Sequence, residues 1–154
     1  MKYLPISAGR LEADPKIRVN LVGTAHIEDA WPAVKALLAP SVALTQGRCS
    51  LDHVRAFLGD GSMHLFVIWD MEHQDVLGAL VTEFRKHPGG LALNICHLGG
   101  RDLARWIDRL LDIERWARSE GCRWVETSGR AGWVKVLGVL GYEPIAAALG
   151  KELL

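Results

Sequence analysis

Residues 91–98 read Leu-Ala-Leu-Asn-Ile-Cys-His-Leu, and the chain continues through Gly99-Gly100-Arg101-Asp102 into an amphipathic segment. The nearly continuous apolar run predicts a strand, and the two adjacent glycines predict a tight turn. From Leu103 onward, apolar residues recur every three or four positions, which predicts one long helix that Asp102 caps and Gly121 ends. The whole stretch is therefore expected to fold as a strand, a glycine turn and a long helix.

Two further strands are expected before this one. Residues 63–69 form a nearly continuous apolar run, and residues 76–85 form a second strand candidate. A turn containing Pro88, Gly89 and Gly90 separates the second candidate from residues 91–98. Because these strands follow one another closely, we expect an antiparallel meander.

The N-terminal part begins with an expected irregular arm at residues 1–16, followed by a strand at residues 17–22, where apolar and polar residues alternate. A helix should follow, with Glu28 in its first turn and its end at Pro40. A second helix should begin at Ser50, a good N-cap, and stop at Gly59-Asp60-Gly61.

After the long helix, residues 122–127 are expected to form a strand, residues 131–140 a short helix, and residues 144–149 a closing strand. A chain of 154 residues has the usual length of one domain, so residues 1–154 are interpreted as a single domain. The fold class is α/β (α+β), with a mixed central sheet.

Composition excludes several classes of protein. The 18 basic and 18 acidic side chains cancel, so no extended nucleic-acid surface is expected. No apolar run approaches the roughly 18 residues of a membrane span, and we expect the cytoplasm as the location, or a virion if the protein is phage-encoded. The three cysteines and six histidines lack the spacing of metal ligands, so we expect no metal.

The order of elements resembles the GNAT superfamily of acyl-CoA-dependent N-acyltransferases. Three features carry the resemblance. Residues 91–98 run directly into the expected glycine turn and long helix, and residues 123–128 form the expected strand after that helix. Residues 133–144 are similar in sequence to the family's late helix and the residues that follow it. The resemblance implies helices on both faces of a sheet that is splayed between the strands before and after the long helix. Residues 128–133 are also similar to a sequence found in small GNAT-like proteins of bacteriophages.

In that family acyl-CoA lies in the gap of the splayed sheet, where a partly unpaired strand offers main-chain groups to pantetheine and a helix N-terminus receives the pyrophosphate. The resemblance therefore implies acetyl-CoA or another acyl-CoA as co-substrate. The resemblance places residues 94–98 beside pantetheine. It places residues 99–101, with the main-chain amides of Leu103 and Ala104, around the phosphate. The predicted cofactor-binding residues are Ile95, Cys96, His97, Leu98, Gly99, Gly100, Arg101, Leu103 and Ala104.

Such a transfer needs a base for the amine and an acid for the leaving thiolate. The candidates are Glu83, His97 and Glu126 as base, and Tyr142, or less strongly Ser128, as acid. Each has a competing interpretation. The two glutamates fit solvent-facing strand positions, His97 a satisfied polar residue at a strand end, and Tyr142 a half-buried core residue.

Two functions therefore remain open. One is an N-acyltransferase that moves an acyl group to an amine on a small molecule or protein. The other is a catalytically inactive GNAT-fold protein that serves in binding or assembly, for example in a phage particle. Arg130 is a candidate contact of a second anion site, beside the alternative of a close strand-to-helix turn. A homodimer or another assembly partner is left open as well.

Overall fold

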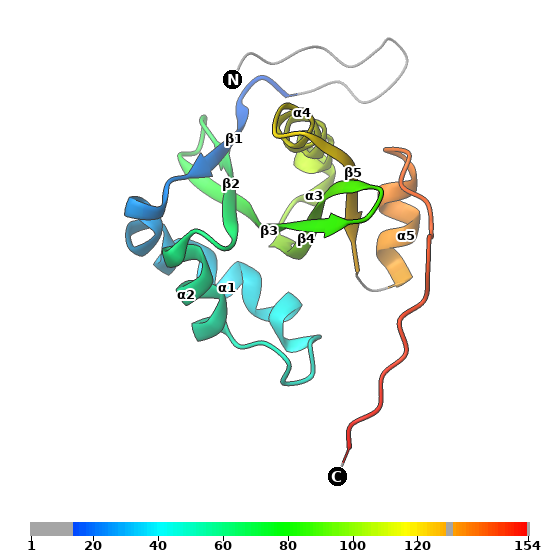
Figure 1. Cartoon of the computed structure of the whole chain (residues 1–154). Helices are drawn as coiled ribbons and strands as arrows, with labels where there is room; N and C mark the ends of the chain where they lie inside the picture. Colours follow the sequence, from blue (N-terminus) through cyan, green and yellow to red (C-terminus); the bar gives the residue numbers. More distant parts are fainter. Residues whose placement is uncertain (1–13, 129–130, 154) are drawn as a thin grey trace.

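The computed structural model describes residues 14–128 and 131–153. Five strands form one sheet, and helices cover it (Figure 1). The elements are β1 (Ile17–Val22), the 3-10 turn η1 (Thr24–His26), α1 (Ile27–Ala43), α2 (Leu51–Asp60), β2 (His64–Asp70), β3 (Asp75–His87), β4 (Gly90–Gly100), α3 (Leu103–Trp106), the 3-10 turn η2 (Ile107–Arg109), α4 (Leu110–Ser119), β5 (Cys122–Thr127) and α5 (Ala131–Gly138).

The strands lie in the sheet in their sequence order, from β1 to β5. β1, β2, β3 and β4 pair antiparallel with one another in that order, which confirms the predicted meander of β2, β3 and β4. β5 pairs parallel to β4, because the chain crosses over through α3 and α4 between these two strands. The sheet is therefore mixed, as the sequence predicted.

Two apolar cores lie on opposite faces of the sheet, which confirms helices on both faces. On one face, α1 and α2 pack against β2 and β3 through a cluster that includes Val34, Leu38 and Leu65. On the other face, α4 packs against β2, β3 and β4 through a cluster that includes Leu80 and Ile113. The alternation of side chains along the strands sends neighbouring residues to opposite cores.

The caps of α2 form as expected. The Ser50 hydroxyl accepts from the His53 main-chain N–H at 3.1 Å, and His53 Nδ1 accepts from the Ser50 N–H at 3.1 Å. This reciprocal pair is a capping box in which a histidine takes the place of the usual glutamate. At the other end Gly61 has φ 82°, the left-handed conformation that ends helices.

The first helix runs past the proline that was expected to end it. α1 continues to Ala43 with both Pro32 and Pro40 inside it. Pro40 removes one main-chain donor, but Leu38 and Val42 on either side are buried in the core between α1 and the sheet. Packing therefore carries the helix one further turn, and that turn contains Ser41.

The long helix expected after the glycine turn is interrupted. α3 ends at Trp106, whose φ of −136° is not helical, and the 3-10 turn η2 leads into α4. Trp106 is buried, its indole N–H donates to the Arg101 carbonyl at 2.8 Å, and its ring lies against Gly78. The contact of this ring with the sheet is incompatible with a straight helix. The amphipathic pattern of the sequence does not reveal such a contact.

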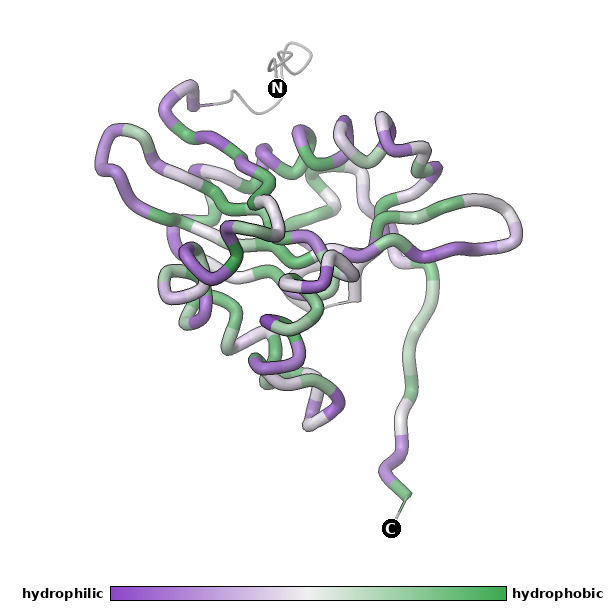
Figure 2. The backbone as a smooth tube through the Cα atoms, turned by 60° about the vertical axis from the view of Figure 1, so that its left-hand side comes forward, coloured by the Kyte–Doolittle hydropathy of each residue, from purple (hydrophilic) through white to green (hydrophobic). Residues whose placement is uncertain are grey.

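The closing strand expected at residues 144–149 is not formed. The described residues 142–153 contain neither helix nor strand, and they leave the body as one extended stretch (Figure 2). Of the expected arm at residues 1–16, only residues 14–16 lie within the described part of the chain, where they form a turn into β1. Arg130, the candidate for a second anion site, lies outside the described residues.

Candidate functional site

The sheet parts between β4 and β5, as the resemblance implied. Their pairing runs from Leu91 opposite Cys122 to Ile95 opposite Thr127, whereas β4 continues to Gly100. The Thr127 hydroxyl donates to the Ile95 carbonyl at 3.0 Å at this last pair. Among the described residues, the β5 side of β4 has no strand partner beyond it. Main-chain polar groups there remain available to a ligand.

A β-bulge lies at the point of parting. Val81 pairs with His97 and Thr82 pairs with Ile95, so Cys96 is the extra residue of β4. A bulge bends its strand and locally increases the twist. It accounts for β4 turning away from β5 immediately after Ile95.

Three polar side chains form a row across the sheet beside the bulge. Glu83 of β3 is opposite Asn94 of β4, and Asn94 is opposite Glu126 of β5. The Asn94 amide donates to Glu83 Oε1 at 3.4 Å and approaches Cys96 Sγ at 3.5 Å. Cys96 packs against the α1 core, which places this row on the face that α1 and α2 partly cover.

Both carboxylates of the row have a basic side chain as a neighbour. Glu126 lies 3.0 Å from His87 Nε2, and its side chain is 18% exposed. Glu83 lies 3.5 Å from the Arg85 guanidinium, and its side chain is 33% exposed. Each carboxylate is therefore held in place and still reachable from solvent. The Glu83 contact is the longer and more open of the two.

His97 is buried beneath α1. Its Nδ1 lies 3.1 Å from the hydroxyl of Ser41, and the residue is only 5% exposed. Burial lowers the pKa of His97, while the nearby Glu83 acts in the opposite direction. The ring is therefore packed against the helix, and its neutral form is favoured.

Cys96 is a protonated thiol at this site. Burial, with the help of Glu83, raises its pKa to about 12. Its Sγ lies 3.7 Å from the Asn94 carbonyl, to which it donates. A thiol held in this state does not act as a nucleophile at neutral pH.

Gly99 and Gly100 were expected to form a turn, but they are the last two residues of β4 and pair with Ala79 and Gly78 of β3. Other parts of the chain approach both glycines closely. A Cβ atom on Gly99 would stand 2.9 Å from the Leu37 carbonyl carbon and nearer still to its oxygen. A Cβ on Gly100 would stand 2.7 Å from the Gly78 Cα. Both glycines are therefore needed because backbone and ring atoms approach them closely.

Arg101 is engaged within the chain. Its guanidinium pairs with Asp75, and its main-chain N–H donates to the Leu77 carbonyl at 2.9 Å. Asp102 does not cap α3 with its side chain, contrary to expectation, because it adopts a left-handed conformation with φ 54°. The amides of Leu103 and Ala104 in the first turn thus face no capping carboxylate from this residue.

Tyr142 lies on the opposite face of the sheet. Its hydroxyl donates to Glu114 of α4 at 3.1 Å, and its ring packs against the core that contains Ile113. Burial and the Glu114 carboxylate both raise the pKa of Tyr142. Ser128 is exposed at the end of the described segment after β5. Of the predicted catalytic residues, the structure thus brings Glu83, His97 and Glu126 together, and it places Tyr142 elsewhere.

Three neighbours of the site were not identified from the sequence. Ser41 was missed because the helix was expected to stop at Pro40. His87 meets Glu126 only through the pairing of β3, β4 and β5, which no local pattern reveals. Arg85 stands two residues from Glu83 on β3, so strand alternation alone puts both side chains on one face. For His87, the one local signal was its position directly before the Pro88-Gly89-Gly90 turn.

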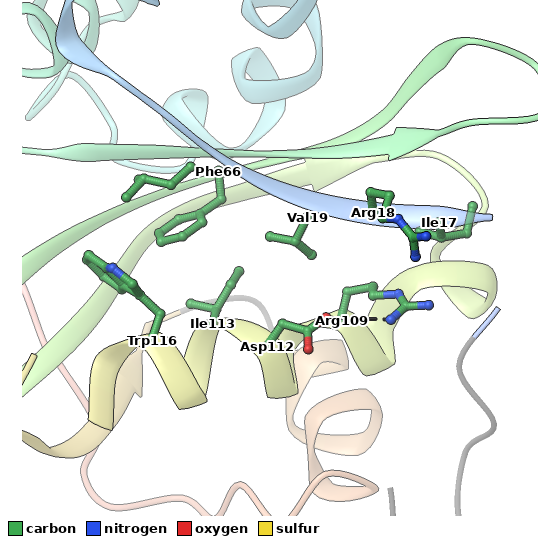
Figure 3. Close-up of a pocket in the computed structure, with 9 residues that line it drawn as sticks. Ile17, Arg18, Val19, Phe66, Arg109, Asp112, Ile113 and Trp116 are labelled. Atoms are coloured by element: carbon green, nitrogen blue, oxygen red, sulfur yellow. Dashed lines mark hydrogen bonds and ion pairs between the residues drawn. The ribbon is translucent and has the colours of Figure 1, made fainter. Parts of the chain in front are cut away.

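A separate cavity lies on the other face, between β1 and α4 (Figure 3). Its volume is about 290 Å³, and Figure 3 shows Val19, Ile113 and Trp116 around one space with Arg109 and Asp112 toward one end. The cavity is lined by Ile17, Arg18, Val19, Leu21, Phe66, Arg109, Asp112, Ile113 and Trp116. No residue of the Glu83 row lines it, so the cavity and the polar row are distinct places on the molecule.

Two kinds of feature are absent from residues 14–128 and 131–153. No group of three or more His, Cys, Asp or Glu side chains could hold a metal ion there. Within the same residues, no helix is long and apolar enough to cross a membrane.

Comparison with known proteins identifies the fold. No protein-family model and no curated protein sequence matches the chain. Solved structures do match it. An aminoglycoside acetyltransferase from an uncultured soil metagenomic sample, in complex with sisomicin, has a TM-score of 0.64 at 10% identity over 90% of this chain and 97% of its own.

Two others extend this result. The aminoglycoside N-acetyltransferase AAC(6')-Iy, in complex with a CoA bisubstrate analogue, has a TM-score of 0.65 at 16% identity over 90% of this chain and 98% of its own. A GNAT family acetyltransferase of Staphylococcus aureus has a TM-score of 0.60 at 13% identity over 90% and 99%. Together with the mixed sheet that parts between β4 and β5, these likenesses show that the chain has the GNAT fold.

Proposed function

We propose that this protein is an N-acyltransferase that moves an acetyl or other acyl group from CoA to an amine. The observation that carries the proposal is the position of the Glu83, Asn94 and Glu126 row. It lies where β4 leaves β5, next to the main-chain groups of residues 96–100. The structures with the same fold include acetyltransferases in complex with CoA or a CoA analogue, which supports the choice of acyl donor.

In this proposal the β5-facing edge of β4 holds the pantetheine arm of acyl-CoA. Ile95, Cys96, His97 and Leu98 supply main-chain hydrogen bonds, as a strand edge does for any extended ligand. The diphosphate lies beyond them, near Gly99, Gly100 and Arg101 and the first-turn amides of Leu103 and Ala104. The thioester then lies beside the bulge.

Glu83 is the proposed base. It removes a proton from the acceptor ammonium, directly or through one water, and the free amine attacks the thioester carbonyl. The carbon–sulfur bond of the tetrahedral intermediate then breaks, the nitrogen gives its second proton through solvent to the departing thiolate, and CoA leaves as a thiol. Two facts favour Glu83 over Glu126. Its side chain is the more exposed of the two, at 33% against 18%, and its 3.5 Å contact with Arg85 is longer than the 3.0 Å contact of Glu126 with His87. The two carboxylates also favour a cationic acceptor such as an amine.

Binding is the first test. Thermal unfolding is followed with acetyl-CoA, CoA, pantetheine and ATP, each at millimolar concentration. A ligand at 100 times its Kd adds roughly 2.7 kcal/mol of stability, so acetyl-CoA and CoA should raise the melting temperature. Thiol release with a panel of monoamines, polyamines and aminoglycosides then measures transfer. Stabilisation by acetyl-CoA followed by thiol release that depends on the amine is the expected result.

One observation favours a second function, a GNAT-fold protein that serves in binding or assembly without catalysis. The side chain and N–H of Arg101 are engaged by Asp75 and Leu77, and the Leu37 carbonyl lies against Gly99, so the end of β4 offers few groups to a diphosphate. If neither acetyl-CoA nor CoA raises the melting temperature at millimolar concentration, this second function replaces the first.

A further inference from the structure

The cavity between β1 and α4 lies where the edge strand of the sheet is incompletely covered (Figure 3). Among the described residues, β1 pairs only with β2. Ile17, Val19 and Leu21 face α4, because side chains alternate along a strand. Ile17 is fully buried, whereas Leu21 is 46% exposed. Within the described chain, α4 therefore leaves part of this apolar strand face open to a ligand.

One end of the cavity is apolar and aromatic. Phe66 of β2 and Trp116 of α4 meet edge to face, with ring centroids 5.1 Å apart. Trp116 also stacks on Phe84 at 5.7 Å, which holds its ring in place. Val19 and Ile113 continue the apolar lining along the cavity (Figure 3). Packing within the chain fixes these walls, so the apolar part of the site is formed before any ligand arrives.

The other end carries more positive than negative charge. Arg18 and Arg109 line it together with Asp112 (Figure 3). Asp112 lies 3.5 Å from the Arg109 guanidinium and 2.7 Å from that of Arg115, so one carboxylate is shared by two guanidinium groups. Asp108 does not line the cavity, and burial raises its pKa, which disfavours its charged form. An anion is therefore the group that complements this end.

Arg18 is the residue best placed to meet that anion. It lines the cavity and is exposed on the edge strand. Across the two described segments of the chain, no carboxylate forms an ion pair with its guanidinium. A hydrogen bond between a guanidinium and a carboxylate is among the stronger polar contacts in proteins. A ligand carboxylate gains this contact at Arg18 without displacing a carboxylate of the described chain.

The volume limits the size of the ligand. At about 290 Å³, the cavity lies at the lower end of the roughly 300–1,000 Å³ that is typical of small-molecule sites. This space suits a carboxylate with one short apolar chain or ring. A nucleotide or a long-chain lipid is too large for it.

We propose that this cavity is a second binding site, which takes a small carboxylate with an apolar tail. The carboxylate pairs with Arg18, and the tail lies between Val19 and Ile113 and ends at the aromatic rings. The site does not depend on acyl transfer, because no residue of the Glu83 row lines it.

Isothermal titration calorimetry of the full chain with octanoate tests the proposal. Octanoate should bind at one site. Octanol and octylamine match its tail but not its charge, and acetate lacks the tail, so each should bind roughly tenfold more weakly or less tightly still. Saturating CoA should not displace octanoate, because the cavity and the polar row are distinct places.

Variants locate the site. Arg18→Gln should weaken octanoate binding roughly tenfold and leave octanol binding unchanged, since only the charged contact is lost. Arg55→Gln removes an exposed arginine on α2 and is its matched control. Val19→Phe fills the cavity and should abolish binding, whereas Asn20→Phe places the same ring on the opposite face of β1 and should not. Circular dichroism checks the fold of each variant, and Arg18 is exposed, so its replacement keeps the fold.

Several results would each overturn the proposal. They are no binding of octanoate at millimolar concentration, octylamine binding as tightly as octanoate, and displacement of octanoate by CoA. Full octanoate affinity in Arg18→Gln or in a folded Val19→Phe variant would overturn it as well.

Discussion

Gly99 of β4 and Leu37 of α1 are in backbone contact, because the Leu37 carbonyl group occupies the space that any side chain on Gly99 would need. This contact fixes α1 against the part of β4 that has left β5. One turn further along the same helix, Ser41 reaches His97. The position of α1 beside the open edge therefore depends on a glycine at residue 99.

Replacing that glycine should destabilise the protein. Gly99→Ala forces α1 and β4 apart, and overpacking of this kind costs about 1–3 kcal/mol in free energy of unfolding. Gly59→Ala is the control, since a Cβ there meets no atom within 4 Å and α2 gains about 0.5–1 kcal/mol from alanine. Urea denaturation of both variants measures the difference. Equal stability of the two would contradict the contact.

Replacement of the proposed base, Glu83, should lower kcat more than replacement of Glu126. Glu83→Gln keeps the size and the hydrogen-bond acceptor but cannot take a proton, so kcat should fall roughly 10²- to 10⁴-fold. Glu126→Gln should have a smaller effect, and Glu72→Gln, on the exposed turn after β2, should have none. Steady-state rates of acetyl transfer at saturating acetyl-CoA provide the measurement. A Glu83→Gln enzyme with unchanged kcat would move the base role to another group.

The pH dependence of stability should contain a contribution from Asp70. This buried carboxylate accepts from the amides of Glu72 and His73, from the His73 ring and from Arg105. Burial alone would raise the pKa of Asp70, but the hydrogen bonds from His73 and Arg105 outweigh it and lower the pKa from 3.8 to about 2. Because the folded pKa is the lower one, the stabilisation is present above about pH 4 and is lost as the pH falls toward 2.

The matched variant is Asp70→Asn, which cannot titrate. Its free energy of unfolding should be lower at pH 6, and the gap from the unaltered protein should narrow between pH 4 and pH 2.5. Urea denaturation across this range checks the prediction. Two curves that stay parallel over these pH values would show that the carboxylate does not couple to folding.

One substitution distinguishes a structural role of Tyr142 from a catalytic one. Tyr142→Phe removes the hydroxyl that Glu114 accepts from, and the loss of a hydrogen bond to a charged group costs about 1.5–3 kcal/mol. Because this hydroxyl lies on the α4 side of the sheet, we expect lower stability and little change in kcat. The paired measurements are denaturation and rate. A hundredfold loss of kcat at unchanged stability would instead support the acid role that the resemblance implied.

Patterns within a few residues were sufficient for much of the fold. The alternating and continuous apolar runs predicted a strand at each of β1 to β5, although β4 was expected to end at residue 98 and not at Gly100. Ser50 and the stretch Gly59-Asp60-Gly61 predicted the limits of α2, because caps depend on groups only a few residues apart. The same local rules failed where distant parts of the chain meet. Pro40 does not end α1, and Trp106 interrupts the helix expected after the glycine turn.

The site divides in the same way. Glu83, His97 and Glu126 could be named as candidates because their types and strand positions suit acid–base chemistry. Their meeting required the register of three strands and the bulge at Cys96.

The amino-acid order alone thus specified the positions of β1 to β5 and of α2, since side-chain periodicity and capping act over one or two turns of chain, but it wrongly predicted a strand at residues 144–149. The folded chain specified where β4 leaves β5, which basic side chain Glu126 meets, and which face of the sheet receives Tyr142. These features follow from packing and strand pairing between residues far apart in sequence, and their energies exist only once both partners are in place.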